Sequence, residues 1–503
     1  MKVKLMVQKS VNLNAHALLA SIKIRLVDVL ETLLAAGMDP NMHRLHDDKW
    51  EYKHAMGYTR TALEEYPLWV AATQHGPEND KLTHEERETR DNSVKMVGLL
   101  LAHGADPFAT FKSRNPSHMS EHVRSVINET KDSVLISVEE LDAEPEFQKV
   151  SILHDLLEHG NLVHPILEMS NLDPHHRDSR GRTVLHAASL SRVGIHAPID
   201  VLLFGAGQEV EGPRQSAPSF LHHLSSIGTD KLAVDNQGRN ILHLMLVAAN
   251  GHLVSCHPIL WVLPLLSEAE ITALTTQADV YGNTPLHLAL RYAILRRDAS
   301  PVEALLEAGA DPFAQDNRGN TALHILAYRV AESEAPWTLF TKMLELGLDI
   351  NTRNSTGQTP IFNLNRSLPV YIGHVGSARA EYVTPAQALA LFEDAGADLF
   401  ARDKHGAGLL HVAAQLKQKE FPRSNRGMRH EQMRVATRFE LLVNKGLDVA
   451  MEDEKKRTAL DVAAAYDNQS VLKLFDKDNV RNKVTAAELE EVGAEYDSDD
   501  MGF

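Results

Sequence analysis

The side chains with the broadest chemistry in this sequence are its histidines, because an imidazole can bind a metal ion or transfer a proton near neutral pH. There are 27 of them, beside a single cysteine. His154, His159 and His164 are spaced so that each is turned by about 140° from the last on a helix, which keeps them off a common face. The segment HLVSCHP at 252–258 holds two histidines and the cysteine, but it lacks a fourth ligand and the spacing of a zinc site. We predict neither a metal site nor a cofactor.

The tripeptide HRD at His176–Asp178 matches part of the catalytic loop of protein kinases. A kinase also needs a downstream asparagine, a glycine-rich loop and a magnesium-binding aspartate motif, whereas Asp178 here precedes Gly181 in a pattern that recurs along the chain. The sequence contains no GxxxxGK phosphate loop, GxSxG elbow, HExxH or CxxC motif. We therefore expect no enzyme activity.

Five histidines occupy the same place in a repeated phrase, which favours a structural role for them: His186, His243, His287, His324 and His411. The phrase reads GNTPLHLAL at 282, and its other copies begin at 181, 238, 319, 357, 406 and 456, with looser ones at 65 and 151. A second phrase, such as LLEAGADPF at 305, follows most copies. A chain of this length with such internal similarity is typical of a repeat array.

The residues of each phrase are those that start or end a helix. In the first, Thr284 can cap a helix and Pro285 suits the first helical position, where a missing N–H is harmless. In the second, Ser300 and Pro301 start another helix in the same way, and Gly309 can adopt the left-handed conformation that ends it. The predicted unit is a first helix, a loop, a second helix and a finger that leads to the next unit.

These features resemble the ankyrin repeat, whose TPLH signature stands unaltered at Thr284–His287, and some stretches look like large uncharacterised ankyrin proteins predicted in filamentous fungi. The resemblance covers most of residues 11–480. It implies an all-α solenoid of about ten to twelve units, each with two antiparallel helices and a β-hairpin finger. It also implies that the repeated histidine forms hydrogen bonds within and between units.

The spacing of the glycines locates the insertions. From the glycine that ends a second helix to the next finger glycine the distance is always ten residues, at 309–319, 347–357 and 396–406. The distance between paired helices varies, so we predict that insertions lie between them and leave the fingers unchanged. We expect divergent repeats over 1–150, further repeats over 151–480 that end in a polar cap, and a disordered acidic tail over 481–503.

The resemblance implies that finger tips contact partners. Because tyrosine and arginine contribute strongly at interfaces, the candidate partner-binding residues are Arg180, Arg182, Arg239, Tyr281, Arg318 and His405. A basic insert over 417–438 has two interpretations: a solvated loop, or a docking site for an acidic partner or for the acidic tail at 488–500. Its candidate residues are Lys417, Arg423, Arg426 and Arg429.

Composition limits the kinds of partner. The net charge of −17 disfavours nucleic acid and anionic membrane surfaces, and one cysteine suits a reducing compartment. No apolar run is long enough to cross a bilayer. We expect a monomer in the cytoplasm or nucleus that acts as a non-catalytic scaffold binding partner proteins through its concave face and finger tips. The alternative is a substrate-adaptor or regulatory subunit of an enzyme complex such as a ubiquitin ligase.

Overall fold

The computed structural model divides the chain into two compact units, which we call unit 1 (1–126 and 140–277) and unit 2 (127–139 and 278–503). The structure describes residues 15–53, 59–73, 84–114, 147–158, 164–169, 171–190, 220–248, 258–296, 298–328, 330, 334–366, 385–415, 435–472 and 474–475. The acidic tail at 481–503 and the four candidate residues of the basic insert lie outside these ranges.

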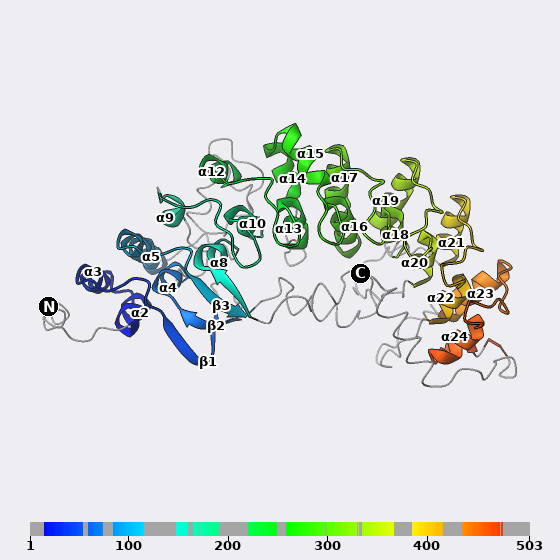
Figure 1. The fold of residues 1–503 in the computed structure, drawn as a ribbon, viewed down its shortest axis with the longest axis horizontal. Helices are drawn as coiled ribbons and strands as arrows, with labels where there is room; N and C mark the ends of the chain where they lie inside the picture. Colours follow the sequence, from blue (N-terminus) through cyan, green and yellow to red (C-terminus); the bar gives the residue numbers. More distant parts are fainter. Residues whose placement is uncertain are drawn as a thin grey trace. The chain divides into compact units, whose positions relative to one another are not determined.

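Unit 1 contains helix pairs of the predicted kind (Figure 1). Its helices are α2 (Ala15–Lys23), α3 (Val27–Ala35), α4 (Pro67–Thr73), α5 (His84–Ala102), α8 (Ile152–Glu158), α9 (His164–Leu167), α10 (Val184–Ser189), α12 (Phe220–Ser226), α13 (Ile241–Ala248), α14 (Ile259–Val262), the 3₁₀ turn η2 (Leu263–Leu265) and α15 (Glu268–Thr276). The first helices α2, α4, α8, α10 and α13 pack on one another in chain order. Since α4 packs on α8, the stack of first helices continues from one side of residue 150 to the other, and the division between the two compact units lies at 277.

Unit 2 has the same construction. Its helices are α16 (Pro285–Arg296), α17 (Ser300–Glu307), α18 (Ala322–Ala327), α19 (Glu334–Glu345), α20 (Pro360–Arg366), α21 (Pro385–Asp394), α22 (Leu409–Gln415), α23 (Val435–Asn444), α24 (Ala459–Ala465) and α25 (Gln469–Leu472). The first helices α16, α18, α20, α22 and α24 again pack in chain order, and α17, α19, α23 and α25 each pack on the first helix of their own repeat.

The core of unit 2 follows the predicted apolar stripes. Leu290 on α16 and both Val302 and Leu305 on α17 are fully buried, as expected for positions three to four residues apart on one helical face. Between neighbouring second helices, the rings of Phe340 and Phe392 pack with centroids 4.8 Å apart. Repeat thus stacks on repeat through apolar side chains.

Helix ends also follow the sequence. Gly309, Gly347 and Gly396 have φ values of 86°, 91° and 82°, in the left-handed region that a helix-ending residue needs. At the last finger Lys456 takes the place of glycine, ten residues after Gly446, and keeps a φ of 61°. The ten-residue spacing therefore marks a fixed backbone path from the second helix to the finger.

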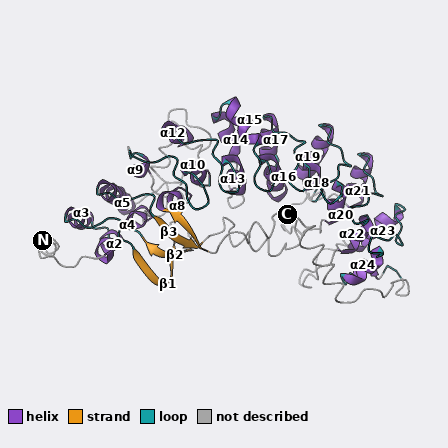
Figure 2. Cartoon of the chain, in the orientation of Figure 1, coloured by secondary structure: helices purple, strands orange, loops and turns teal. Residues whose placement is uncertain are grey.

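A four-stranded antiparallel sheet in unit 1 departs from the prediction (Figure 2). Its strands, in the order β1-β2-β3-β4, are β1 (Arg44–Lys53), β2 (Thr59–Glu65), β3 (Thr110–Arg114) and β4 (Phe147–Ser151). They lie between a second helix and the next first helix, so these two fingers are extended into strands. Our expectation that fingers stay unchanged is wrong here, because strands that pair satisfy each other's backbone groups and allow a longer finger.

Candidate partner-binding fingers

Each regular finger is built around an aspartate or asparagine that binds backbone N–H groups. Oδ1 of Asp316 accepts hydrogen bonds from the backbone nitrogens of Arg318 at 2.9 Å and Asn320 at 2.8 Å. The i+4 contact recurs at Asp178, Asp235, Asp279, Asn354, Asp403 and Asp453. Such side-chain-to-backbone bonds fix a tight turn, so the fingers share one backbone conformation.

Neighbouring fingers are hydrogen-bonded to each other. In unit 2 the backbone nitrogen of Asn317 donates to the carbonyl of Tyr281 at 3.0 Å, and that of Lys404 donates to Thr356 at 2.8 Å. The finger glycine permits this approach: a Cβ on Gly282 would lie 2.5 Å from the backbone nitrogen of Asn317. The fingers therefore form a ladder that runs from repeat to repeat.

The repeated histidines hold helix and finger together. Nδ1 of His324 accepts from the backbone nitrogen of Thr321 at 3.2 Å, so Nε2 carries the proton and donates to the carbonyl of Gln358 in the next finger at 3.0 Å. Equivalent Nε2 contacts occur at His154, His186 and His411. Burial lowers the pKa of His154, His186, His287 and His324 to about 4, and these imidazoles are neutral at pH 7.

The described residues show no gathering of three His, Cys, Asp or Glu side chains around a point where a metal ion could bind. His154 is fully buried in a repeat contact, while His159 and the cysteine-containing segment 252–257 lie outside the described residues. The repeated histidines His154, His186, His324 and His411 are thus committed to packing and hydrogen bonding within the stack.

Sequence reasoning missed one variant of this contact. Trp69 stands where other repeats have histidine, and its Nε1 donates to Oδ2 of the fully buried Asp155 in the next repeat at 2.8 Å. The signal was the phrase YPLW, in which tryptophan keeps an N–H donor at the histidine position. A looser copy of the phrase therefore forms the same link between repeats by other chemistry.

Arg182 is a correction to the predicted partner-binding set. Only 1% of it is exposed, and its guanidinium binds Asp178 Oδ2 from Nη2 at 2.7 Å and Glu158 Oε2 from Nη1 at 3.0 Å. Asn283 and Asn320, which also follow a finger glycine, likewise bind the aspartate of their own finger. A side chain that is buried in this way cannot contact a partner.

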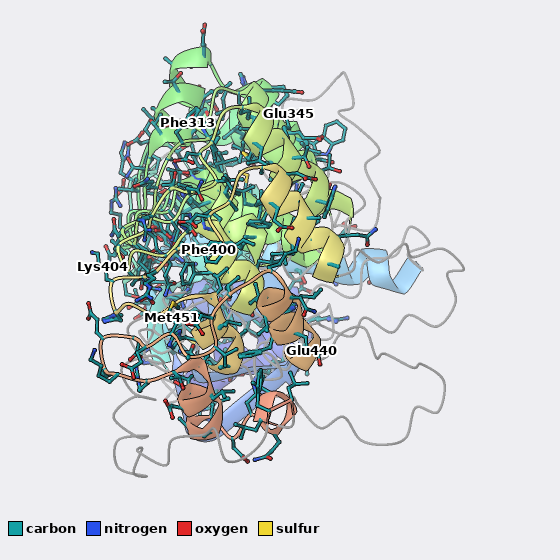
Figure 3. The ribbon with its side chains drawn as sticks, turned by 90° about the vertical axis from the view of Figure 1, so that its right-hand side faces the viewer. Phe313, Glu345, Phe400, Lys404, Glu440 and Met451 are labelled. Carbon is teal, nitrogen blue, oxygen red and sulfur yellow. The ribbon has the colours of Figure 1, made fainter. Side chains whose placement is uncertain are left out.

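The other predicted tips differ in exposure. Arg180, Arg239, Tyr281 and Arg318 are half-buried, and His405 is exposed. In each of these fingers, the residue directly after the aspartate or asparagine is exposed to solvent: Ser179, Asn236, Val280, Asn317, Ser355, Lys404 and Glu454. Figure 3 shows Lys404 projecting at the finger edge of unit 2. The signal for these positions was their place in the repeat rather than their residue type.

Two phenylalanines are exposed on a different part of unit 2. Phe313 is 55% exposed and Phe400 is 65% exposed, and both lie in the loop between a second helix and the following finger (Figure 3). Asp311 and Asp398 fix these loops, since each Oδ1 accepts from the backbone nitrogen of the phenylalanine at 2.9 Å. Sequence reasoning used the aspartates as turn signals and did not single out the aromatic side chains.

Comparison with known proteins identifies the repeated unit. The family model described as Ankyrin repeat matches residues 281–317. The chain is 37% identical over 93 residues to the Nuclear factor NF-kappa-B p105 subunit of Gallus gallus, a match that covers 18% of this chain and 8% of the relative. It is 32% identical over 148 residues to the Neurogenic locus notch homolog protein 2 of Homo sapiens, covering 29% and 5%.

A third relative is the E3 ubiquitin-protein ligase KEG of Arabidopsis thaliana, 28% identical over 170 residues, which are 33% of this chain and 10% of the relative. The chain thus spans a small part of each of these curated relatives. None of the described helices combines the length and hydropathy needed to cross a bilayer. Residues 281–317 are thus an ankyrin repeat, and the same finger and helix geometry recurs in the described repeats on both sides of it.

Proposed function

We propose that this chain is a non-catalytic scaffold that binds partner proteins through the exposed tips of its fingers. The observation that carries the proposal is the finger ladder: backbone hydrogen bonds hold neighbouring tips at fixed spacing, as between Asn317 and Tyr281 at 3.0 Å. A surface that is already ordered loses little conformational freedom on binding.

The exposed tips vary while the turn beneath them does not. Val280 is 52% exposed, and Asn317, Ser355 and Lys404 follow it in unit 2. Variation at exposed positions on a constant backbone is what a recognition surface requires, because specificity is a difference between affinities for alternative partners. Arg182 is removed from the candidate set, and Arg180, Arg239, Tyr281, Arg318 and His405 remain in it.

A second candidate function is a substrate-adaptor or regulatory subunit of an enzyme complex. Its support is the similarity of 33% of the chain to a protein named as an E3 ubiquitin-protein ligase. An adaptor must carry its enzyme with it, so a stoichiometric ligase subunit that remains bound during purification distinguishes this function from a scaffold. We also propose a cytoplasmic or nuclear location and a monomeric state. Light scattering on the purified chain tests the oligomeric state.

The test of the scaffold is affinity purification with mass spectrometry from the native cell. The finger variant combines Tyr281→Ala, Arg318→Ala and Lys404→Ala, and the matched control in the same unit combines Phe313→Ser and Phe400→Ser. We expect the finger variant to lose a defined set of proteins that the control retains. Loss from the control alone would place the partner surface on the loops after the second helices and contradict the proposal.

A further inference from the structure

Arg182 in unit 1 shows what a buried arginine needs at the junction between a first helix and the following finger. Two carboxylates surround it: Asp178 binds Nε at 2.8 Å and Nη2 at 2.7 Å, and Glu158 at the end of α8 binds Nη1 at 3.0 Å. A buried charge that lacks such partners carries a large desolvation cost. At Arg182, the ion pairs with Asp178 and Glu158 offset that desolvation cost.

Arg291 in unit 2 is buried at the equivalent kind of junction without that pairing. It lies on α16, only 8% of it is exposed, and its nearest carboxylate oxygen is Asp316 Oδ2 in the next finger, 3.9 Å from Nη2. Its Nε has no hydrogen-bond partner among the described residues. Asp316 is held in place by its own finger, since its oxygens accept from both Arg318 and Asn320.

A second N–H donor in this junction, on His287, lacks a hydrogen bond of normal geometry. His287 precedes Arg291 by one helical turn and so lies on the same face of α16. Its Nδ1 accepts from Thr284 at 3.2 Å, which leaves the proton on Nε2. This nitrogen faces the backbone carbonyl of Asn320 in the next finger, but it makes no hydrogen bond of normal length and angle to the described residues. The junction therefore holds a buried guanidinium whose Nε lacks an acceptor, one turn from an imidazole N–H that faces a single carbonyl.

We propose that the junction between α16 and the finger at 316–319 is a carboxylate-binding site, and that the acidic segment 488–500 of this chain occupies it. A carboxylate there would complete the pair of acidic groups that Arg182 already has in unit 1. About a tenth of the Arg291 side chain remains exposed, and a ligand would have to approach it there. Guanidinium and carboxylate match geometrically through two parallel hydrogen bonds.

The charge of the segment favours it as the occupant. Residues 488–500 contain seven carboxylates and no lysine or arginine. In a chain of net charge −17, acidic surfaces repel such a segment, whereas a buried arginine without close pairing attracts it, as does the basic insert over 417–438.

The segment is long enough to reach the site. From α16 to α24 the first helices pack in four successive steps, each about 10 Å between helix axes, which gives about 40 Å in total. The 22 residues from Phe475 to Asp497 extend to about 75 Å. The proposal is independent of any partner at the finger tips.

The test measures binding of a fluorescent synthetic peptide of residues 484–503 to the full-length chain by anisotropy. In the parent protein for this assay, the seven carboxylates are replaced by amides so that the chain's own segment does not compete: Glu488, Glu490, Glu491, Glu495, Asp497, Asp499 and Asp500. We compare Arg291→Gln with Arg402→Gln, which removes the same charge from an exposed position of unit 2. A third variant replaces the four candidate residues of the basic insert by glutamine: Lys417, Arg423, Arg426 and Arg429.

We expect Arg291→Gln to weaken peptide binding about thirtyfold or more, while Arg402→Gln and the basic-insert variant change it little. If Arg402→Gln weakens peptide binding equally, or if only the basic-insert variant loses peptide binding, the proposed carboxylate site at Arg291 is contradicted. The native chain should bind the peptide more weakly than the amide parent, since its own segment occupies the site. Equal peptide affinity of the native chain and the amide parent would contradict the proposal that segment 488–500 occupies the site.

Folding of the variant is checked separately. Arg291→Gln removes a buried charge that lacks close pairing, so its melting temperature should not fall. Where it does fall, Arg291→Lys serves instead: a lysine keeps the charge but lacks the planar fork, and it should bind the peptide with intermediate affinity. Parent-like affinity in Arg291→Lys, with the melting temperature unchanged, would contradict recognition by the guanidinium fork.

Discussion

At the scale of the residue, the same amino acid has different roles according to its junction. Arg182 is fully buried between two carboxylates, Arg239 pairs with Asp235 at 2.8 Å while 18% of its side chain is exposed, and Arg291 is buried 3.9 Å from its only described acidic neighbour. Burial and the number of acidic neighbours decide which of these arginines stabilises the fold and which is available to a ligand.

The buried ion pairs of Arg182 predict a large effect of its removal. Arg182→Gln leaves Asp178 and Glu158 buried without their cation, and we expect the free energy of unfolding of unit 1 to fall by about 3–5 kcal/mol. Arg239→Gln is the matched control in the next repeat and should cost about 1 kcal/mol or less, because its pair is partly solvated. Urea unfolding of the full chain measures both, and similar losses would contradict the role assigned to Arg182.

At the scale of the element, the finger is the unit that the sequence repeats most faithfully. Asp316 binds the backbone of its turn, Gly319 adopts a φ of 74°, and the next finger's Ser355 donates to Arg318. Each of these contacts is local or reaches one repeat further. The finger therefore keeps its geometry although its tip residues vary.

Two glycines differ in what they require: Gly309 needs only a left-handed backbone, whereas Gly282 also needs space for the next finger. Gly282 and Gly309 have φ values of 79° and 86°, but a Cβ would lie 2.5 Å from the Asn317 nitrogen at Gly282 and meets nothing within 4 Å at Gly309. We expect Gly309→Ala to cost about 1 kcal/mol, the price of a left-handed residue. Gly282→Ala should cost clearly more, since it also pushes two fingers apart. Thermal unfolding compares the two, and equal losses would mean that finger contact contributes nothing.

At the scale of the whole molecule, the repeated histidines give both units the same response to acid. His154 and His186 in unit 1, like His287 and His324 in unit 2, have pKa values lowered to about 4 by burial. The unfolded chain binds these protons near pH 6.5. Between pH 6.5 and 4 the unfolded state therefore binds more protons, and stability falls as the pH falls.

At pH 5.5 each of these histidines should lower the free energy of unfolding by about 1.4 kcal/mol relative to pH 8. Guanidinium unfolding at the two pH values measures the loss. His324→Gln removes one titrating group, so the variant should lose less stability than the native chain over the same interval. An identical loss in both proteins would show that His324 does not titrate as its burial requires.

The sequence by itself determined the repeat, the paired helices, the turn aspartates and the ten-residue path from helix end to finger. Gly309 and Gly319 lie where that spacing put them, with positive φ values of 86° and 74°. These features could be predicted because caps, turns and apolar stripes depend on residues a few positions apart.

Only the tertiary structure decided what happens where repeats meet. The burial of Arg182 depends on Glu158, 24 residues earlier, and Trp69 depends on Asp155, 86 residues later. The extended fingers in unit 1 depend on pairing between β2 and β3 across a similarly long separation. The exposure of a side chain and its partners are properties of the neighbouring repeat, and a local pattern holds no information about a neighbour that distant.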